Sequence, residues 1–176
     1  MKRLAPLAVG LLLIFAIVYG TGLTPWRVSF NRTESLPLGF YLVSDNVGLL
    51  KRGQAVCFRY VEPDWAKGRY LPPGSFICKE VLGLPGDSVI SAPHELILRA
   101  PDGAHALHLP LLEHDRKGKV LEHPEWAPKQ QVPDGSLFLG SVRVPNSFDS
   151  RYLGFINRSA VVNTITPLFV FEHGRN

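Results

Sequence analysis

Short runs of alternating apolar and polar residues recur along most of this chain, after one long apolar segment at its N-terminus. Alternation places successive side chains on opposite faces of an extended strand, so these runs predict β-strands. Gly, Pro, Asn and Asp separate them, as is typical of turns. The predicted strands lie within residues 31–60, 75–82, 87–91, 95–99, 137–139, 154–156 and 166–171. With 16 Gly and 15 Pro in 176 residues, long helices in the body are disfavoured, and the pattern predicts a mainly β fold.

The N-terminal apolar segment covers residues 4–23. Its length matches the roughly 20 residues that a membrane-spanning helix needs. Lys2 and Arg3 precede it and no comparable basic cluster follows, which predicts that the N-terminus lies in the cytoplasm. Tyr19 and Trp26 suit the opposite membrane interface.

We therefore expect a single transmembrane helix in residues 1–24 and one folded domain outside the cytoplasm in residues 25–176. The alternative is a cleaved signal peptide, because residues 20–22 (GTG) offer small side chains at the spacing of a cleavage site. A retained anchor would suit a protein that must meet membrane-embedded partners.

A lysine stands inside the apolar strand-like run 76–82. Alternation puts Lys79 on the same face as Ile77 and Val81, whereas Glu80 points to the other face. Removing water from around an ammonium group favours its neutral form, and a neutral lysine can act as a general base. The alternative is an ordinary surface lysine at a strand edge.

Upstream, residues 31–41 read NRTESLPLGFY and begin just after the apolar segment. Pro37 restricts the backbone near Ser35, and Gly39 lets the chain turn closely. A serine on a rigid turn facing a neutral lysine would form a Ser–Lys nucleophilic dyad. Taken alone, this run marks an ordinary turn; the lysine run downstream favours the catalytic interpretation.

Two further motifs complete the pattern: residues 79–87 read KEVLGLPGD, and residues 146–154 read NSFDSRYLG. In this order after an apolar segment, the three motifs resemble those of the type I signal peptidases. The spacing Asn-x-Thr-x-Ser-x-Pro in a short chain with one anchor is most similar to the conjugative-transfer branch of that family, the TraF peptidases. The resemblance covers the apolar segment and most of residues 31–90 and 133–156, and leaves 91–132 as a variable insertion. It implies a signal-peptidase-like β-fold catalytic domain.

The resemblance also implies roles for individual residues. Ser35 would be the nucleophile and Lys79 the general base. The backbone N–H of Ser35 and the hydroxyl of Thr33 would form the oxyanion hole. Asp149 would be essential to catalysis, and no metal or organic cofactor would be needed.

Two more residues would support the dyad. Ser147 would hydrogen-bond near the lysine ammonium, and Arg151 would form an ion pair with Asp149. The alternative for this pair is a solvated turn with a surface ion pair of little value. The chain departs from the family pattern at Leu36, where methionine is usual, and at residues 140–142, which read GSV where Gly-Asp-Asn is usual.

Composition and charge limit the possible fold and binding partners. The chain is 45% hydrophobic and 19% charged, which permits a packed core. Its net charge is +4, but the basic residues are scattered and not interleaved with aromatics, so we expect no nucleic-acid partner and at most weak attraction to anionic lipid.

The cysteines and histidines are candidates for a disulfide and for metal ligands. Cys57 and Cys78 lie in two strand-like runs, and a disulfide and two buried thiols are both open. The histidines at 105, 108, 114 and 123 match no metal-ligand spacing, and we interpret them as surface residues.

Together these features predict a membrane-anchored serine endopeptidase of the bacterial inner membrane, with its catalytic domain in the periplasm. The TraF resemblance implies that it processes a pilin precursor, meets mating-pair-formation components, and joins the termini of its substrate into a circular subunit. The alternative is a non-catalytic anchored β-domain that scaffolds pilus or secretion components. A self-cleaving Ser–Lys repressor would need a DNA-binding domain in place of the anchor, and the sequence has none.

Overall fold

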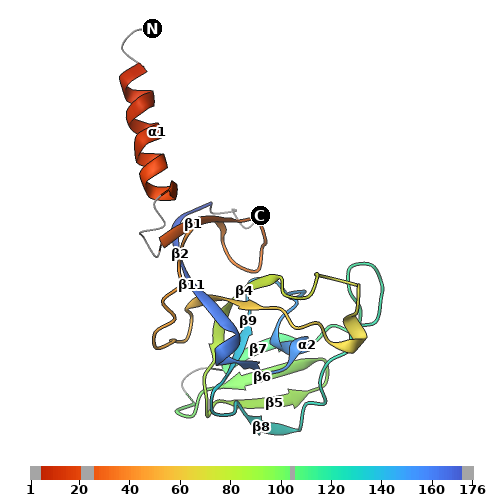
Figure 1. Ribbon diagram of the computed structural model, residues 1–176. Coiled ribbons are helices and arrows are strands. Elements are labelled where there is room, and N and C mark those ends of the chain that lie inside the picture. Colours follow the sequence, from red (N-terminus) through yellow and green to blue (C-terminus); the bar gives the residue numbers. More distant parts are fainter. Residues whose placement is uncertain (1–4, 21–25, 104–105, 172–176) are drawn as a thin grey trace.

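In the computed structural model, which describes residues 5–20, 26–103 and 106–171, one helix stands apart from a β-sheet body (Figure 1). The helix α1 covers Ala5–Gly20. The other described helices are short: α2 covers Ser150–Leu153, and the single 3₁₀ turns η1 and η2 cover Asp64–Ala66 and Arg158–Ala160. The predicted mainly β architecture is confirmed.

The larger sheet has seven strands in the order β1-β2-β11-β3-β4-β9-β10, and all of its strand pairs are antiparallel. In chain order the strands are β1 (Trp26–Asn31), β2 (Leu38–Ser44), β3 (Ala55–Arg59), β4 (Phe76–Gly83), β9 (Ser136–Gly140), β10 (Ile156–Asn157) and β11 (Val161–Phe171). The long strand β11 lies between β2 and β3, and β3 pairs with β4. The serine-bearing hairpin β1–β2 is therefore connected to the lysine-bearing strand β4 through β11 and β3.

The smaller sheet has four antiparallel strands in the order β7-β6-β5-β8. Its strands are β5 (Ser88–Ala92), β6 (Glu95–Arg99), β7 (Ala106–Pro110) and β8 (Lys129–Gln131). The sequence predicted only β6 within residues 91–132. The polar and histidine-rich flanks concealed the alternation of Leu107 and Leu109, and β8 is too short to leave a pattern.

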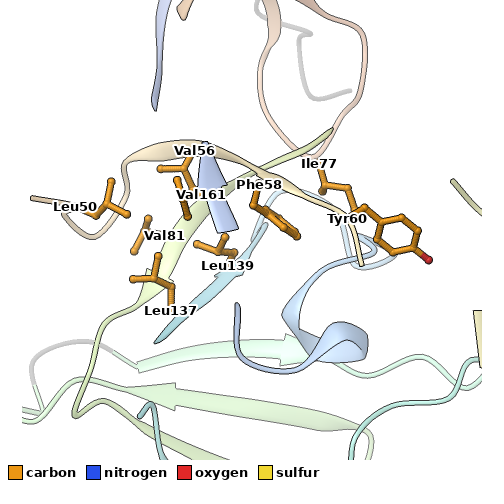
Figure 2. Packing of buried hydrophobic residues seen from close by; sticks show 9 residues of the cluster. All are labelled: Leu50, Val56, Phe58, Tyr60, Ile77, Val81, Leu137, Leu139 and Val161. Atoms are coloured by element: carbon orange, nitrogen blue, oxygen red, sulfur yellow. The ribbon is translucent and has the colours of Figure 1, made fainter. Parts of the chain in front are cut away.

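Two apolar clusters hold the body together. Figure 2 shows the first, which lies under β3, β4, β9 and β11 and includes Val56, Phe58, Val81 and Leu139. The second joins the two sheets, because Leu82 of β4 and Phe138 of β9 pack with residues of β5, β6 and β7. The strand β4 contributes to both clusters and is therefore firmly held.

Gly39 has a role other than the predicted turn. It lies in β2 with φ of +150°, and β11 approaches it closely at an irregularity between Pro167 and Phe169. A Cβ atom at Gly39 would lie 2.1 Å from the carbonyl oxygen of Phe169. The residue is needed for strand packing beside the serine turn.

The two cysteines form a disulfide. Cys57 of β3 is directly paired with Cys78 of β4, and their sulfurs are bonded across the two strands. Of the two states that the sequence left open, the structure has the oxidised one. The bond lies one residue before Lys79.

The helix α1 is shorter than the predicted membrane span. It covers 16 residues, and the part of the chain that the structure describes contains no helix long and apolar enough to cross a membrane. Residues 1–4 and 21–25, which the prediction included in part, lie outside the described ranges. The described large apolar side chains of α1 are exposed: Leu7, Val9, Leu11, Leu12, Leu13, Ile14, Phe15 and Ile17.

Candidate active site

Ser35 lies on the connection between β1 and β2, and one side chain holds that connection in place. The amide nitrogen of Asn31 donates to the carbonyl oxygens of Thr33 (2.8 Å), Leu36 (3.1 Å) and Pro37 (3.0 Å). Its oxygen accepts from the backbone N–H of Thr33 at 3.2 Å. Because one asparagine satisfies several backbone groups at once, the turn has a defined shape without being part of the sheet.

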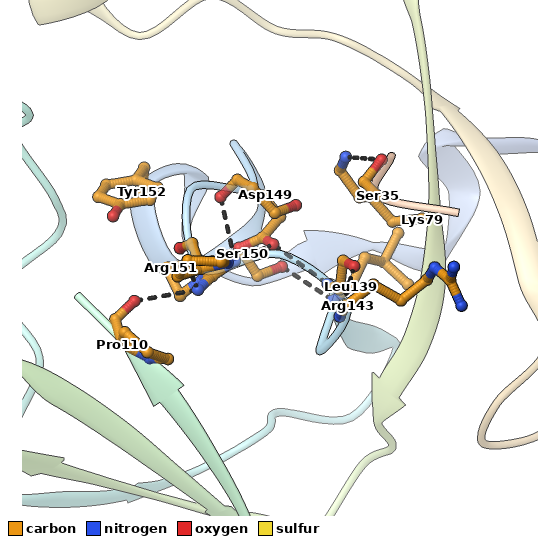
Figure 3. Close-up of polar contacts among 12 residues, drawn as sticks. Ser35, Lys79, Pro110, Leu139, Arg143, Asp149, Ser150, Arg151 and Tyr152 are labelled. Carbon is orange, nitrogen blue, oxygen red and sulfur yellow. Dashed lines mark hydrogen bonds and ion pairs between the residues drawn. The ribbon is translucent and has the colours of Figure 1, made fainter. Parts of the chain in front are cut away.

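Lys79 reaches Ser35 from the middle of β4. Its Nζ lies 2.7 Å from Ser35 Oγ, a contact between segments 44 residues apart in the sequence (Figure 3). The lysine is only 7% exposed, and Ile77 and Val81 on the same face are buried. The structure therefore brings together the two residues that the sequence paired.

Burial changes the acidity of this lysine. Loss of water around the ammonium group lowers the pKa of Lys79 from 10.5 to about 8. The negative charge of Asp149 opposes this shift and the positive charge of Arg151 adds to it. The amine is thus partly neutral near pH 8, as a general base requires.

Asp149 and Arg151 form a fully buried ion pair. The Arg151 Nε donates to Asp149 Oδ1 at 2.9 Å, and its Nη2 donates to Oδ2 at 2.8 Å. The remaining guanidinium donors bind the carbonyl oxygens of Pro110, Pro145 and Ser147. The pair is 0% and 1% exposed, so the alternative of a solvated surface pair is wrong.

Asp149 also orders the backbone around it. Its carboxylate accepts from the N–H of Arg151, which caps α2, and from the N–H of Ser141 at the end of β9. Within the described residues it forms no hydrogen bond with Ser35 or Lys79. Asp149 therefore orders the backbone of this segment, and its negative charge raises the pKa of Lys79.

The predicted oxyanion donors differ in availability. No hydrogen bond among the described residues uses the backbone N–H of Ser35. The Thr33 hydroxyl is 3.5 Å from Ser35 Oγ but donates its proton to Asn31 Oδ1 at 2.8 Å. It can donate to a substrate oxygen only after rotating away from Asn31.

Ser147 does not make the predicted contact. Its hydroxyl is buried and has no hydrogen-bond partner among the described residues, so the expected bond near the Lys79 ammonium is absent. The backbone of Ser147 is held instead by Arg151, whose Nη2 donates to the Ser147 carbonyl oxygen at 3.2 Å.

The two departures from the family pattern have structural explanations. Leu36 is 1% exposed and packs with Tyr41, Cys57 and Ile165, so its position requires an apolar side chain of suitable volume. In the Gly140-Ser141-Val142 run, the Ser141 backbone N–H contacts Asp149, and any residue type except proline supplies that donor.

Several supporting residues were missed by the sequence reasoning. Asn31 shapes the serine turn, and its place four residues before the serine is a usable signal in the sequence. The Ser150 hydroxyl accepts from the N–H of Leu139 at 2.9 Å, and the Tyr152 hydroxyl accepts from the N–H of Leu112 at 2.9 Å. The last two contacts depend on the tertiary structure and leave no signal in the sequence.

Ser35 and Lys79 open onto a cleft of about 750 Å³. The loop before β4 and the segment 146–148 contribute to its walls, and residues 112–121 of the predicted variable insertion form much of another wall. His114 lines this cleft, whereas His108 lies elsewhere, against Glu95 at 3.1 Å. His105 is outside the described residues. A buried base beside a hydroxyl at the floor of an open cleft can perform nucleophilic attack on a bound carbonyl.

This chain is similar to known proteins. The conjugal transfer protein TraF of Agrobacterium fabrum (strain C58 / ATCC 33970) is 33% identical over 175 residues, covering 93% of this chain and 92% of that protein. A crystal structure of a signal peptidase I from Enterococcus faecalis V583 is similar with a TM-score of 0.41 and 22% identity, over 69% of this chain and 100% of that chain. Residues 1–170 match the family described as signal peptidase, peptidase S26. Since this match spans nearly the whole sequence and includes all three motifs, the chain belongs to the S26 signal peptidase family.

Proposed function

We propose that this chain is a serine endopeptidase in which Ser35 is the nucleophile and Lys79 the general base. The observation that carries the proposal is the 2.7 Å contact between Lys79 Nζ and Ser35 Oγ at the floor of a cleft. Burying a lysine is costly, and a protein that only scaffolds other components has no use for one placed against a serine. This argues against the non-catalytic alternative.

The reaction follows from these two groups. Neutral Lys79 takes the Ser35 hydroxyl proton while Oγ forms a bond with the scissile carbonyl carbon. Collapse of the tetrahedral intermediate breaks the C–N bond, and the lysine ammonium gives its proton to the leaving amine. The neutral lysine then deprotonates the nucleophile that attacks the acyl-enzyme, and the Ser35 hydroxyl is restored.

The free N–H of Ser35 stabilises the negative charge on the carbonyl oxygen, and Thr33 adds a second donor after rotating away from Asn31. Asp149 and Arg151 hold the segment 145–151 against the dyad and tune the pKa of Lys79 by their opposite charges. The chain's own residues therefore supply the nucleophile, the base and the oxyanion donors, whereas the group that resolves the acyl-enzyme comes from outside the chain.

The substrate proposal rests on the relative rather than on the geometry. The A. fabrum relative is named a conjugal transfer protein. We infer that this chain processes a pilin precursor for conjugation and works beside other mating-pair-formation components. An amine of the same substrate resolves the acyl-enzyme, which joins the termini of the pilin into a circle.

We further propose that the chain is anchored in the bacterial inner membrane with its β-domain, residues 25–176, in the periplasm. The exposed apolar surface of α1 supports this, since exposing such a helix to water is unfavourable. Figure 1 shows α1 on the side of the body where β1, β2 and β11 lie, and Val28, Phe30, Phe40, Phe169 and Phe171 of these strands are also exposed. The Cys57–Cys78 disulfide fits an oxidising compartment.

The first prediction concerns the dyad. Ser35→Ala and Lys79→Met each lower processing of a purified pilin precursor by about 10³-fold or more, because each removes a group that the chemistry needs. Lys51→Met, which changes an exposed lysine outside the cleft, retains activity. Circular dichroism of each variant checks that the fold is intact. More than a few per cent of activity in a folded dyad variant would remove that residue from its role.

The second prediction is a pH profile. Lys79 must be neutral to accept a proton, and its pKa is about 8, so kcat/KM should rise with pH through about 8 and then level off. Steady-state kinetics between pH 6 and 10 measure this limb. Glu80→Gln is the matched control, because Glu80 does not perturb Lys79. A flat profile between pH 7 and 9 would contradict the role of Lys79.

The third prediction concerns the product. Intact mass spectrometry of the mature pilin from cells with the active protein should give a mass one water below that of the linear processed chain. Cells with the Ser35→Ala variant should retain the precursor. A linear mature pilin would refute cyclisation and leave the peptidase proposal intact.

The fourth prediction concerns the membrane. In a Gram-negative host the chain should sediment with the inner membrane, resist carbonate extraction, and become sensitive to added protease in spheroplasts. The Leu11→Arg/Ile14→Arg variant should leave the membrane fraction, since charged side chains within the bilayer are costly. A wild-type chain found in the soluble fraction would overturn the anchor proposal.

A further inference from the structure

A compact hairpin covers part of the cleft. Residues 113–121 turn back on themselves, with the N–H of Leu121 donating to the carbonyl of Glu113 and the N–H of Asp115 donating to that of Lys119. Asp115 Oδ1 accepts from the N–H groups of Lys117 and Lys119, which closes the tip. This hairpin, residues 113–121, belongs to the segment that the sequence left as a variable insertion.

The base of the hairpin is fixed to the buried ion pair. Arg151 Nη1 donates to the carbonyl of Pro110 at 3.0 Å, and the Leu112 N–H donates to the Tyr152 hydroxyl at 2.9 Å. Both bonds link the end of β7 to the short helix α2. The hairpin therefore leaves the small sheet at a position set by the same residues that surround the dyad.

The far side of the hairpin is held across the cleft. The Tyr70 hydroxyl donates to Asp115 Oδ2 at 3.0 Å, and Arg69 Nη2 donates to the carbonyl of Val120 at 3.0 Å. Arg116 lies 3.8 Å from the carboxylate of Glu34, the residue before the nucleophile. These contacts keep the hairpin tip close to the serine turn.

The cleft is strongly basic. Apart from Lys79, its described lining includes five cations, Arg32, Arg69, Arg116, Lys117 and Lys119, against two carboxylates, Glu34 and Asp115. Both carboxylates already contact partners within the protein. Lys117 and Lys119 are exposed, and neither side chain forms an ion pair among the described residues. A cleft of one charge sign favours ligands of the opposite sign.

We infer that this cleft selects peptides with carboxylates within a few residues of the scissile bond, and that Lys117 and Lys119 are the residues that select them. The inference rests on the proposed peptidase function and names the chemistry of its substrate. Arg116 positions the hairpin against the serine turn, and the two lysines contact the substrate carboxylates.

The first experiment measures cleavage selectivity. The purified full-length chain in detergent is incubated with a tetradecapeptide mixture of balanced composition, and mass spectrometry identifies the cleaved bonds. Asp and Glu should be enriched near them. For a cleaved acidic peptide, its Asn/Gln twin should have kcat/KM about 2- to 20-fold lower, as expected for two exposed charge pairs. This ratio should shrink in high salt because exposed charges are screened.

Two double variants test whether the selectivity comes from the hairpin lysines or from the overall positive charge of the protein. Lys117→Gln/Lys119→Gln should bring the acid-to-amide ratio close to one. Lys51→Gln/Lys129→Gln removes the same charge from exposed lysines outside the cleft and should keep the wild-type ratio. An equal loss of selectivity in both variants, or no acidic preference in the wild type, would overturn the inference. A C-terminally amidated copy of the peptide tells whether the recognised carboxylate is a side chain or the chain end.

A binding assay separates this inference from the proposed function. Fluorescence anisotropy compares a labelled alanine-rich dodecapeptide with four Glu and its twin with four Gln, each on the Ser35→Ala protein. Tighter binding of the acidic peptide, lost in the hairpin double variant, would support the inference even if no peptide is cleaved. Equal binding of both peptides would refute it even if the peptidase is active.

Discussion

The site depends on the removal of water from one amine. Lys79 projects from the centre of β4 to the cleft floor, where the only hydrogen bond of its side chain among the described residues is to Ser35. A charged ammonium in such a place is unfavourable, and the protein responds by lowering its pKa to about 8 rather than by pairing it with a carboxylate. The apolar cluster that holds β4 is thus also what favours the neutral form of this lysine.

The surrounding polar contacts hold the dyad without taking part in it. Asn31 shapes the serine turn, and Asp149 with Arg151 orders the segment beside Lys79. The guanidinium binds carbonyl groups from two separate segments, the end of β7 and residues 145–147. Truncating either member of such a pair would leave a buried charge unpaired, so the pair stabilises this segment without touching Ser35 or Lys79.

The insertion, residues 91–132, contributes to both the smaller sheet and the cleft. Its strands complete the smaller sheet and share an apolar cluster with β4 and β9, and its hairpin brings cations to the cleft. The insertion thus shapes the lining of the cleft without contributing to the contact between Ser35 and Lys79. Function in such a family resides in the site and its loops rather than in the fold.

The sequence by itself determined most of the strands, the family, and the pairing of Ser35 with Lys79, because alternation and motif order are local properties of the chain. It also gave the correct face for Lys79. It could not reveal β1, β7 and β8, the lack of a hydrogen-bond partner for the Ser147 hydroxyl among the described residues, or the donation of the Thr33 proton to Asn31. These were decided only by the tertiary structure, because burial, rotamers and hydrogen-bond partners depend on which distant segments meet.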